Sequence, residues 1–139
     1  MREILFRGKR LDNGEWVEGY LIVFPKSKRT KIMVWEQADL DFNAIEVNPE
    51  TIGQYTGLTD KNGKNGKKIF EGDIVQAKIE SGNHEGFMWN PMTVAFLKGS
   101  FCLTDRKGYA FAVLGAFASS VTFEIIGNIH DNLELLEVE

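Results

Sequence analysis

Short apolar runs separated by turn residues recur along the whole chain, and this alternation is what most constrains the fold. The runs are rich in valine, isoleucine, phenylalanine and threonine, which favour pleated strands. No segment keeps the three- and four-residue apolar spacing over the length that an amphipathic helix needs. We therefore predict a mainly β protein with few short helices, and strands over residues 3–6, 15–24, 31–35, 44–47, 73–79, 92–97, 100–104, 110–114 and 121–129.

Turn residues fall between these strands and set their ends. The Asn13-Gly14 pair tolerates the positive φ angles of a tight hairpin, and Pro25 cannot donate to a strand ladder, so it closes the second strand. Residues 109–120 are apolar enough for a helix, but their glycine and aromatic residues favour two strand pieces. The tail over residues 131–139 fits one helical turn or a short strand.

Evenly spaced short strands favour a small barrel, because closing a sheet on itself removes its exposed edges. The chain from Ile69 onward offers about five such strands, enough for an SH3-like barrel. We therefore expect a β-rich N-terminal lobe over residues 1–65, packed with an SH3-like barrel lobe over residues 66–139. In a chain of 139 residues these lobes can also behave as one compact unit.

The composition indicates a folded protein with little attraction for polyanions. Hydrophobic residues make up 43% of the chain, enough for a core, and the net charge is −4, which argues against a dedicated nucleic-acid binder. Cys102 is the only cysteine, so no internal disulfide forms, and its apolar neighbours predict a core position. No run approaches the ~20 apolar residues of a membrane span or resembles a signal peptide. We expect a cytoplasmic protein without membrane contact.

The stretch from Gln54 to Val75 contains four glycines and four lysines, which raises three ligand-binding hypotheses. A phosphate-binding P-loop needs an earlier glycine and a following Ser or Thr, and the Gly66-Lys67 pair has neither at the required spacing. A calcium loop needs an oxygen ligand where Lys64 stands. The lysines could contact nucleic-acid phosphates, but no aromatic residue is interleaved to stack on bases. We therefore interpret the stretch as a solvated turn built on Asn-Gly pairs.

Positive and negative charges are segregated along the chain. Residues 1–31 hold eight Lys or Arg against four Asp or Glu, whereas residues 124–139 hold five acidic residues and no Lys or Arg. The densest basic stretch contains Lys26, Lys28 and Arg29, and we expect it at a hairpin tip. A solvated loop is the favoured interpretation, but such a patch could also contact nucleic acid, an acidic partner or the acidic tail of a neighbouring subunit.

Residues with catalytic or metal-binding chemistry are few. His84 and His130 are the only histidines, and with an isolated cysteine they do not supply a zinc site, so no metal or other cofactor is expected. No serine stands in a nucleophile motif. Glu71, Asp73 and Asp131 could form a nuclease-like metal site if the fold brought them together, but acidic residues at strand starts are common and this hypothesis is disfavoured.

Four stretches carry a resemblance to a known family. They are Met1 to Arg10, Gln54-Tyr55-Thr56-Gly57-Leu58, Glu71-Gly72-Asp73-Ile74-Val75 and Ile125-Ile126-Gly127-Asn128-Ile129-His130-Asp131-Asn132. In this order they resemble the YopX family of phage and prophage proteins, across nearly the whole chain. The chain departs from the family pattern in two ways. Asn65-Gly66-Lys67 repeats the preceding Asn62-Gly63-Lys64, which lengthens the central turn by three residues. Phe70 and His130 stand where tyrosine is common in the family, and Leu133 stands where proline is common.

The resemblance implies a β-rich fold with an SH3-like barrel and a phage or prophage origin. It implies no established biochemical activity, so it supplies no catalytic residues. The motifs fit architecture better than chemistry: Gly72 suits a turn that leads into a strand, and the Asn128 amide can bond local backbone where a strand ends. We assign structural roles to the motif residues Gln54, Tyr55, Thr56, Gly57, Glu71, Gly72, Asp73, Gly127 and Asn128.

Three functions compete at this point. The favoured one is a non-enzymatic binding module that acts as a homo-oligomer, with a phage or host protein as a further partner; Trp35 and Trp89 are candidate exposed contacts. The alternative is a nucleic-acid-binding protein that uses the basic loops, with contacts from Lys26, Lys28, Arg29, Lys64 and Lys67. A second alternative is a metal-dependent hydrolase built on the three carboxylates named above.

Overall fold

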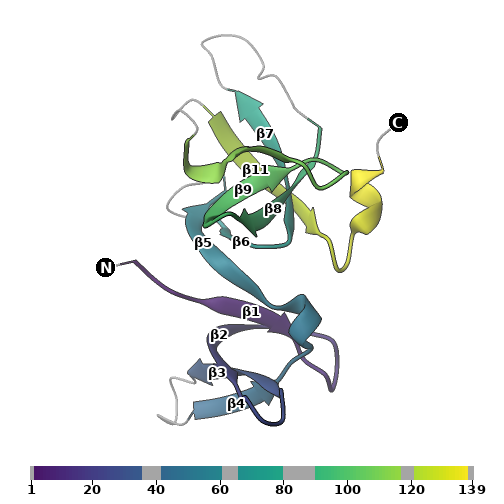
Figure 1. The fold of residues 1–139 in the computed structure, drawn as a ribbon. Helices are drawn as coiled ribbons and strands as arrows, with labels where there is room; N and C mark the ends of the chain where they lie inside the picture. The colour runs from purple at the N-terminus through teal and green to yellow at the C-terminus, as the bar shows by residue number, and fades with distance from the viewer. Residues whose placement is uncertain (1, 36–41, 61–65, 80–89, 117–120, 138–139) are drawn as a thin grey trace. The chain divides into compact units, whose positions relative to one another are not determined.

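The computed structural model describes residues 2–35, 42–60, 66–79, 90–116 and 121–137. The fold is mainly β, as predicted, and every pairing between the described strands is antiparallel (Figure 1). The strands are β1 Phe6–Lys9, β2 Trp16–Val23, β3 Thr30–Trp35, β4 Phe42–Glu46, β5 Gly53–Thr59, β6 Lys68–Phe70, β7 Asp73–Ile79, β8 Met92–Leu97, β9 Ser100–Thr104, β10 Ala110–Val113 and β11 Val121–Asn128. Short 3₁₀ turns cover Pro49–Thr51, Leu114–Ala116 and Leu133–Leu136.

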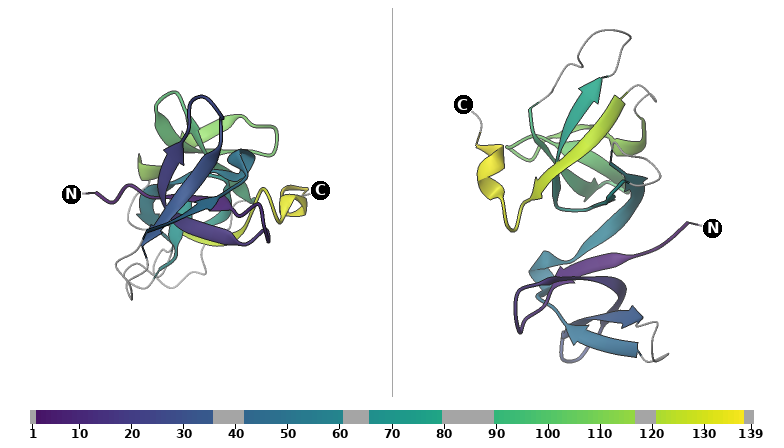
Figure 2. Two further views of the ribbon diagram at one scale, coloured as in Figure 1. Left: turned by 90° about the horizontal axis from the view of Figure 1, so that it is seen from below. Right: turned by 180° about the vertical axis from the view of Figure 1, so that it is seen from behind.

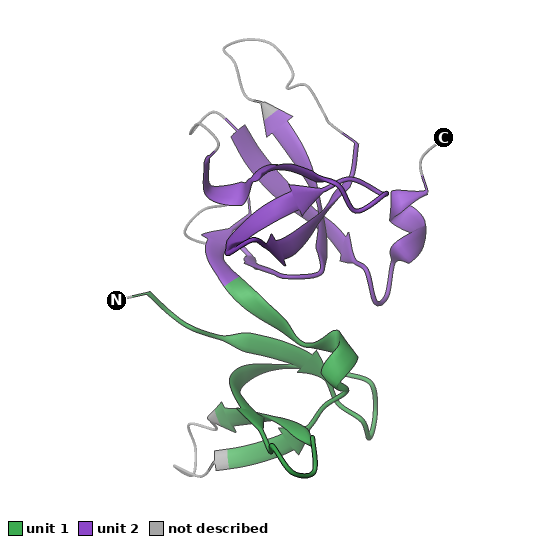
Figure 3. Cartoon of the chain, viewed as in Figure 1, with its two compact units in different colours: residues 1–55 green, residues 56–139 purple. Residues whose placement is uncertain are grey.

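The chain divides into two compact units, residues 1–55 and residues 56–139 (Figure 3). Strand β5 begins in the first unit and ends in the second. No helix in the described part of the chain is long and apolar enough to cross a membrane.

In the first unit, β2 bends sharply so that its two halves pair with different strands. Its first half pairs with β1, from Trp16 opposite Lys9 to Gly19 opposite Phe6, and the remainder pairs with β3, beginning at Tyr20. Gly19 stands at the bend and is buried. A Cβ atom there would lie 2.1 Å from the carbonyl oxygen of Met33, so only glycine lets the two backbones approach this closely.

The end of β4 returns to the end of β1. Arg10 and Val47 form an isolated antiparallel bridge, Leu11 N donates to Glu46 O at 3.1 Å, and Asn48 N donates to Lys9 O at 2.8 Å. Among the described residues of this unit, the largest fully buried side chains are Ile32 and Val47. The four strands therefore curl around a small apolar centre, as the lower part of Figure 1 shows.

In the second unit, five strands form one sheet in the order β10-β9-β8-β7-β11, and Figure 2 shows β7 and β11 side by side. Alternate residues of β8 are buried, as expected for a strand with one face on the core. A register shift between Ile125 and Gly127 marks a bulge in the long ladder with β7. The buried cluster comprises Ile69, Val75, Ala77, Met92, Val94, Leu103, Leu114 and Phe123, and Phe101, Val121 and Ile125 pack against it.

The sheet of the second unit is open in the described residues. No described ladder joins β10 to β11, the two ends of the sheet order, so the closed SH3-like barrel expected from the sequence is not found. What the structure confirms is the coarser prediction of a mainly β fold with few short helices; the short strands form antiparallel sheets.

Several strand predictions require correction. The strand predicted over residues 3–6 begins at Phe6 and continues to Lys9. Strands β5 and β6 fall in the stretch interpreted as a turn; β5 forms because its backbone pairs with the distant β1, with Gln54 opposite Phe6. Residues 114–116 form a 3₁₀ turn rather than a second strand piece, and residues 117–120 lie outside the described part.

Candidate functional site

The Glu71-Gly72-Asp73 motif forms a tight turn between β6 and β7. Gly72 has a φ of +89°, in the left-handed region that glycine tolerates. Its N–H donates to Val94 O at 2.8 Å, and its carbonyl accepts from Ile129 N at 2.9 Å. The buried Asp73 carboxylate accepts a hydrogen bond from Phe70 N at 2.8 Å. The turn therefore fastens β8 and the end of β11 to the start of β7.

The motif near the C-terminus is a self-contained hydrogen-bonded turn. Asn128 Oδ1 accepts from the backbone N–H groups of His130 and Asp131, each at 2.9 Å, and Asn128 Nδ2 donates to Asp131 Oδ2 at 3.1 Å. Asn132 Oδ1 accepts from Asn128 N at 3.2 Å. A Cβ at Gly127 would lie within 2.8 Å of the Asn132 side chain, so the motif requires glycine there.

These two motifs meet, but the three candidate carboxylates do not form a metal centre. Asp73 stands opposite Asn128 in the β7–β11 ladder, which brings the two turns together. The Asp73 carboxylate is buried and bonded to backbone, whereas Asp131 is exposed and bonded to Asn128. In the described part of the chain no group of three His, Cys, Asp or Glu is placed to hold a metal ion. His84 lies outside the described residues, and His130 is exposed.

The Gln54-Tyr55-Thr56-Gly57 motif lies within β5. Tyr55 N donates to Leu5 O at 2.8 Å, and Thr56 Oγ1 donates to Ile69 O at 2.8 Å. Gly57 has a φ of +88°, and a Cβ at this position would meet no atom within 4 Å, so the backbone angle rather than crowding favours glycine. These contacts hold strands together.

The lysine-rich loop closes at its base like a hairpin. Asp60 N donates to Lys67 O at 2.9 Å, and Lys67 N donates to Asp60 Oδ1 at 3.0 Å. Asp60 is buried, so this closure is part of the fold. Lys64 lies outside the described residues, and nothing in the described base of the loop gathers phosphate-binding groups.

The basic stretch lies at the tip of the β2–β3 hairpin, as the sequence predicted. Phe24 N donates to Arg29 O at 3.0 Å and Lys28 N donates to Phe24 O at 2.8 Å, which closes the turn. Lys28 has a φ of +57°, an angle that lysine adopts only in tight turns. Lys26, Lys28 and Arg29 are all exposed.

Cation–π contacts form between β1 and β2 and at the β2–β3 hairpin, and sequence reasoning missed them. The Arg7 guanidinium carbon lies 4.6 Å from the centre of the Trp16 ring, and Lys9 Nζ lies 5.5 Å from it. Lys31 Nζ lies 5.7 Å from the centre of the Phe24 ring. The pairing of Lys9 with Trp16 follows from the β1–β2 register, which the Asn13-Gly14 turn could have suggested.

Large apolar side chains are exposed at two places on the sheet of the second unit, along the edge strand β10 and at the end of β8, with β9 between them. We call this group the apolar strip; it comprises Phe96, Leu97, Tyr109, Phe111 and Val113. Phe96 also stacks edge-to-face on Phe101, with ring centres 5.0 Å apart. The contacts suggested from the sequence, the Trp35 side chain and Trp89, lie outside the described residues.

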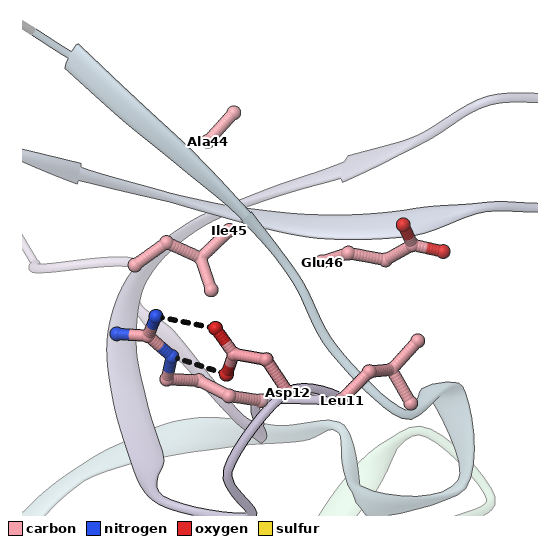
Figure 4. Close-up of a pocket in the computed structure, with 6 residues that line it drawn as sticks. Leu11, Asp12, Ala44, Ile45 and Glu46 are labelled. Atoms are coloured by element: carbon pink, nitrogen blue, oxygen red, sulfur yellow. Dashed lines mark hydrogen bonds and ion pairs between the residues drawn. The ribbon is translucent and has the colours of Figure 1, made fainter.

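A pocket of about 420 Å³ opens on the first unit between the β1–β2 turn and β4 (Figure 4). Arg10 forms a two-point ion pair with Asp12, at 2.8 and 2.7 Å. The hydrogen bond from Arg10 lowers the pKa of Asp12, and the same bond raises the pKa of Arg10. The two charges satisfy each other, so the pair leaves no uncompensated charge to attract a ligand. The pocket is lined by Arg10, Leu11, Asp12, Ala44, Ile45 and Glu46.

Comparison with known proteins identifies the family. The family model described as YopX protein matches residues 5–137. Among solved structures, the chain is similar to protein yopX from Bacillus subtilis, with 16% identity, a TM-score of 0.57, and coverage of 100% of this chain and 99% of that one. It is also similar to protein EF1440 from Enterococcus faecalis, with 25% identity, a TM-score of 0.58, and coverage of 99% and 100%. No curated protein matches. The chain, matched by the family model over nearly all its length, belongs to the YopX family.

Proposed function

We propose that this protein is a non-enzymatic binding module that acts as a homo-oligomer, and that its copies meet through the apolar strip. The observation that carries the proposal is the exposure of the strip: Tyr109, Phe111 and Val113 are 70%, 59% and 48% exposed. Tyr109, Phe111 and Val113 follow one another along one edge of the sheet, and exposed apolar side chains gathered in this way are typical of interaction surfaces.

The edge strand beside the strip supports self-association. In the described part of the chain β10 ends the sheet order, and an edge strand can take up a further strand along its outer side. Residues 110–113 carry no charge and no proline, the features that usually protect an edge strand. Two copies of β10 paired antiparallel about a two-fold axis would therefore meet without opposing like charges.

We also propose that the second unit, which carries the apolar strip, resembles an SH3-like module. Its five antiparallel strands of four to eight residues support it. The setting we propose is the cytoplasm of a bacterium that carries a phage or prophage, where a phage or host protein could be a further partner of the oligomer.

The mass of the protein in solution tests this proposal. Size-exclusion chromatography with light scattering should give at least twice the mass of one chain for the wild type, and the mass of a single chain for Val113→Lys. Leu133→Lys is the matched control, because Leu133 is an exposed apolar residue of the same unit outside the strip; it should keep the oligomer. A wild type that is monomeric at the concentrations used for light scattering, or an oligomer unaffected by Val113→Lys, would refute the proposal.

A further inference from the structure

The strand registers of the first unit place a set of basic and aromatic residues on one face. Cross-strand partners lie on the same side of a sheet, and so do alternate residues of a strand. Lys9 stands opposite Trp16, and Lys31 stands opposite Ile22. The alternating residues of β2 on this side are Trp16, Glu18, Tyr20 and Ile22.

The other side of the same strands faces the centre of the unit. Leu21 stands opposite Ile32, which is fully buried, and Gly19 is buried beside it. The face that carries Tyr20 is therefore the outer one, which agrees with the exposure of this ring.

The hairpin tip extends this outer face. The hydrogen bond from Phe24 N to Arg29 O continues the ladder by one pair, which puts both residues on the side of Tyr20 and Ile22. The contact of Lys31 with the Phe24 ring confirms that they share a side. We call this surface the basic–aromatic face; it comprises Arg7, Lys9, Trp16, Tyr20, Phe24, Arg29 and Lys31.

Positive charge dominates the basic–aromatic face although the whole chain is acidic. The face carries four Lys or Arg, whereas the register adds only Glu18, opposite Arg7, and Glu46, opposite Lys31. The exposed Lys26 and Lys28 lie next to it at the hairpin tip. Such a local excess attracts phosphates even when the net charge of the protein is negative.

Two of the rings on this face are open to solvent. Tyr20 is 58% exposed and Phe24 is 43% exposed, whereas Trp16 is partly covered by Arg7 and Lys9. The cation–π contacts hold basic groups against the surface beside the rings. Exposed rings next to ordered cations are what proteins use to bind unpaired bases and the phosphates that connect them.

We propose that the basic–aromatic face binds single-stranded nucleic acid, with bases stacked on Tyr20 and Phe24 and phosphates near Arg29 and Lys31. Double-stranded nucleic acid is a poorer ligand, because its bases are stacked inside the duplex and cannot stack on the rings. An acidic protein would bind the basic side chains but would make no use of the exposed rings. The site uses the first unit, so it does not depend on the self-association proposed for the second.

Fluorescence anisotropy with a labelled oligo-dT and a duplex of equal length tests the site at low and at moderate salt. We expect the wild type to bind the single strand more tightly than the duplex, and more weakly at the higher salt. Tyr20→Ser and Phe24→Ser should each weaken binding at least about fivefold. Arg29→Glu should weaken it and flatten the salt dependence.

Val23→Ser is the matched control, because Val23 is an exposed apolar residue of the same hairpin on the opposite face. It should bind like the wild type. The proposal is wrong if the single strand does not bind at low salt, or if the control loses as much affinity as the ring variants. It is also wrong if duplex or poly-glutamate binds equally well and removal of the rings has no effect, because any polyanion would then suffice.

Discussion

Replacing Gly19 with alanine should unfold the first unit at much lower denaturant, because the bend in β2 leaves no room for a methyl group. The new Cβ would sit 2.1 Å from the Met33 carbonyl oxygen and 2.9 Å from Ile32 Cγ2. The obstacle is main chain in the β2–β3 ladder, which cannot move aside like the end of a flexible side chain. To reach a normal contact, the two strands must separate by roughly 1 Å.

The cost of Gly19→Ala has two parts. Overpacking a tight site costs about 1–3 kcal/mol, and each backbone hydrogen bond weakened by the separation costs about 0.5–1.5 kcal/mol more. We expect the free energy of unfolding to fall by about 2–4 kcal/mol. With a urea slope of about 1–3 kcal/mol/M, the midpoint falls by roughly 0.7–4 M.

Urea titration followed by circular dichroism and tryptophan fluorescence measures this change. Gly115→Ala is the control, because a Cβ there meets nothing within 4 Å and the φ angle is not positive; its midpoint should match the wild type within error. If the two variants unfold at the same urea concentration, the argument that a steric limit sets the bend is refuted.

Two further predictions follow from local contacts. Gly127→Ala should lower the free energy of unfolding by about 1–3 kcal/mol, since its Cβ displaces the Asn132 side chain that caps β11; an unchanged urea midpoint would contradict this. NMR titration should show Asp12 with a pKa below its ordinary value of 3.8, and Arg10→Gln should raise it towards that value. Because the folded-state pKa is lowered, any stabilisation from the ion pair is present above the ordinary pKa and lost as pH falls through the lowered one; an unshifted Asp12 would show that the pair does not form in solution.

The local sequence is sufficient to predict the bounds of strands that have a clear pattern of apolar and β-branched residues. The strands over residues 73–79, 92–97 and 100–104 have the bounds that the sequence predicts, because alternation or dense β-branched residues lie between clear turn signals. Strand β5 is not predicted from the sequence, because its polar residues and glycines do not give a strand pattern. It forms by pairing with β1, whose residues are almost fifty positions away in the sequence.

The steric limit at Gly19 and the proposed binding surface depend on tertiary pairing to an even greater degree. Nothing around Gly19 indicates a steric limit until β3 is placed across it. The basic–aromatic face likewise emerges only when the strand registers place Arg7 and Lys9 on the same side as Trp16, and Lys31 on the same side as Phe24. The motifs that stand out in the sequence, in contrast, form hydrogen-bonded turns around Gly72 and Asn128.

The double link between Asp60 and Lys67 has a practical use. The two hydrogen bonds fix the residues at both ends of the lysine loop, so an insertion into the loop should not disturb the strands that it connects. Doubling the length of a loop costs only about 0.6 kcal/mol of closure entropy. The chain already carries one tandem Asn-Gly-Lys copy at this place. An epitope or fluorescent tag inserted there would report the location of the protein in cells while both sheets keep their pairing.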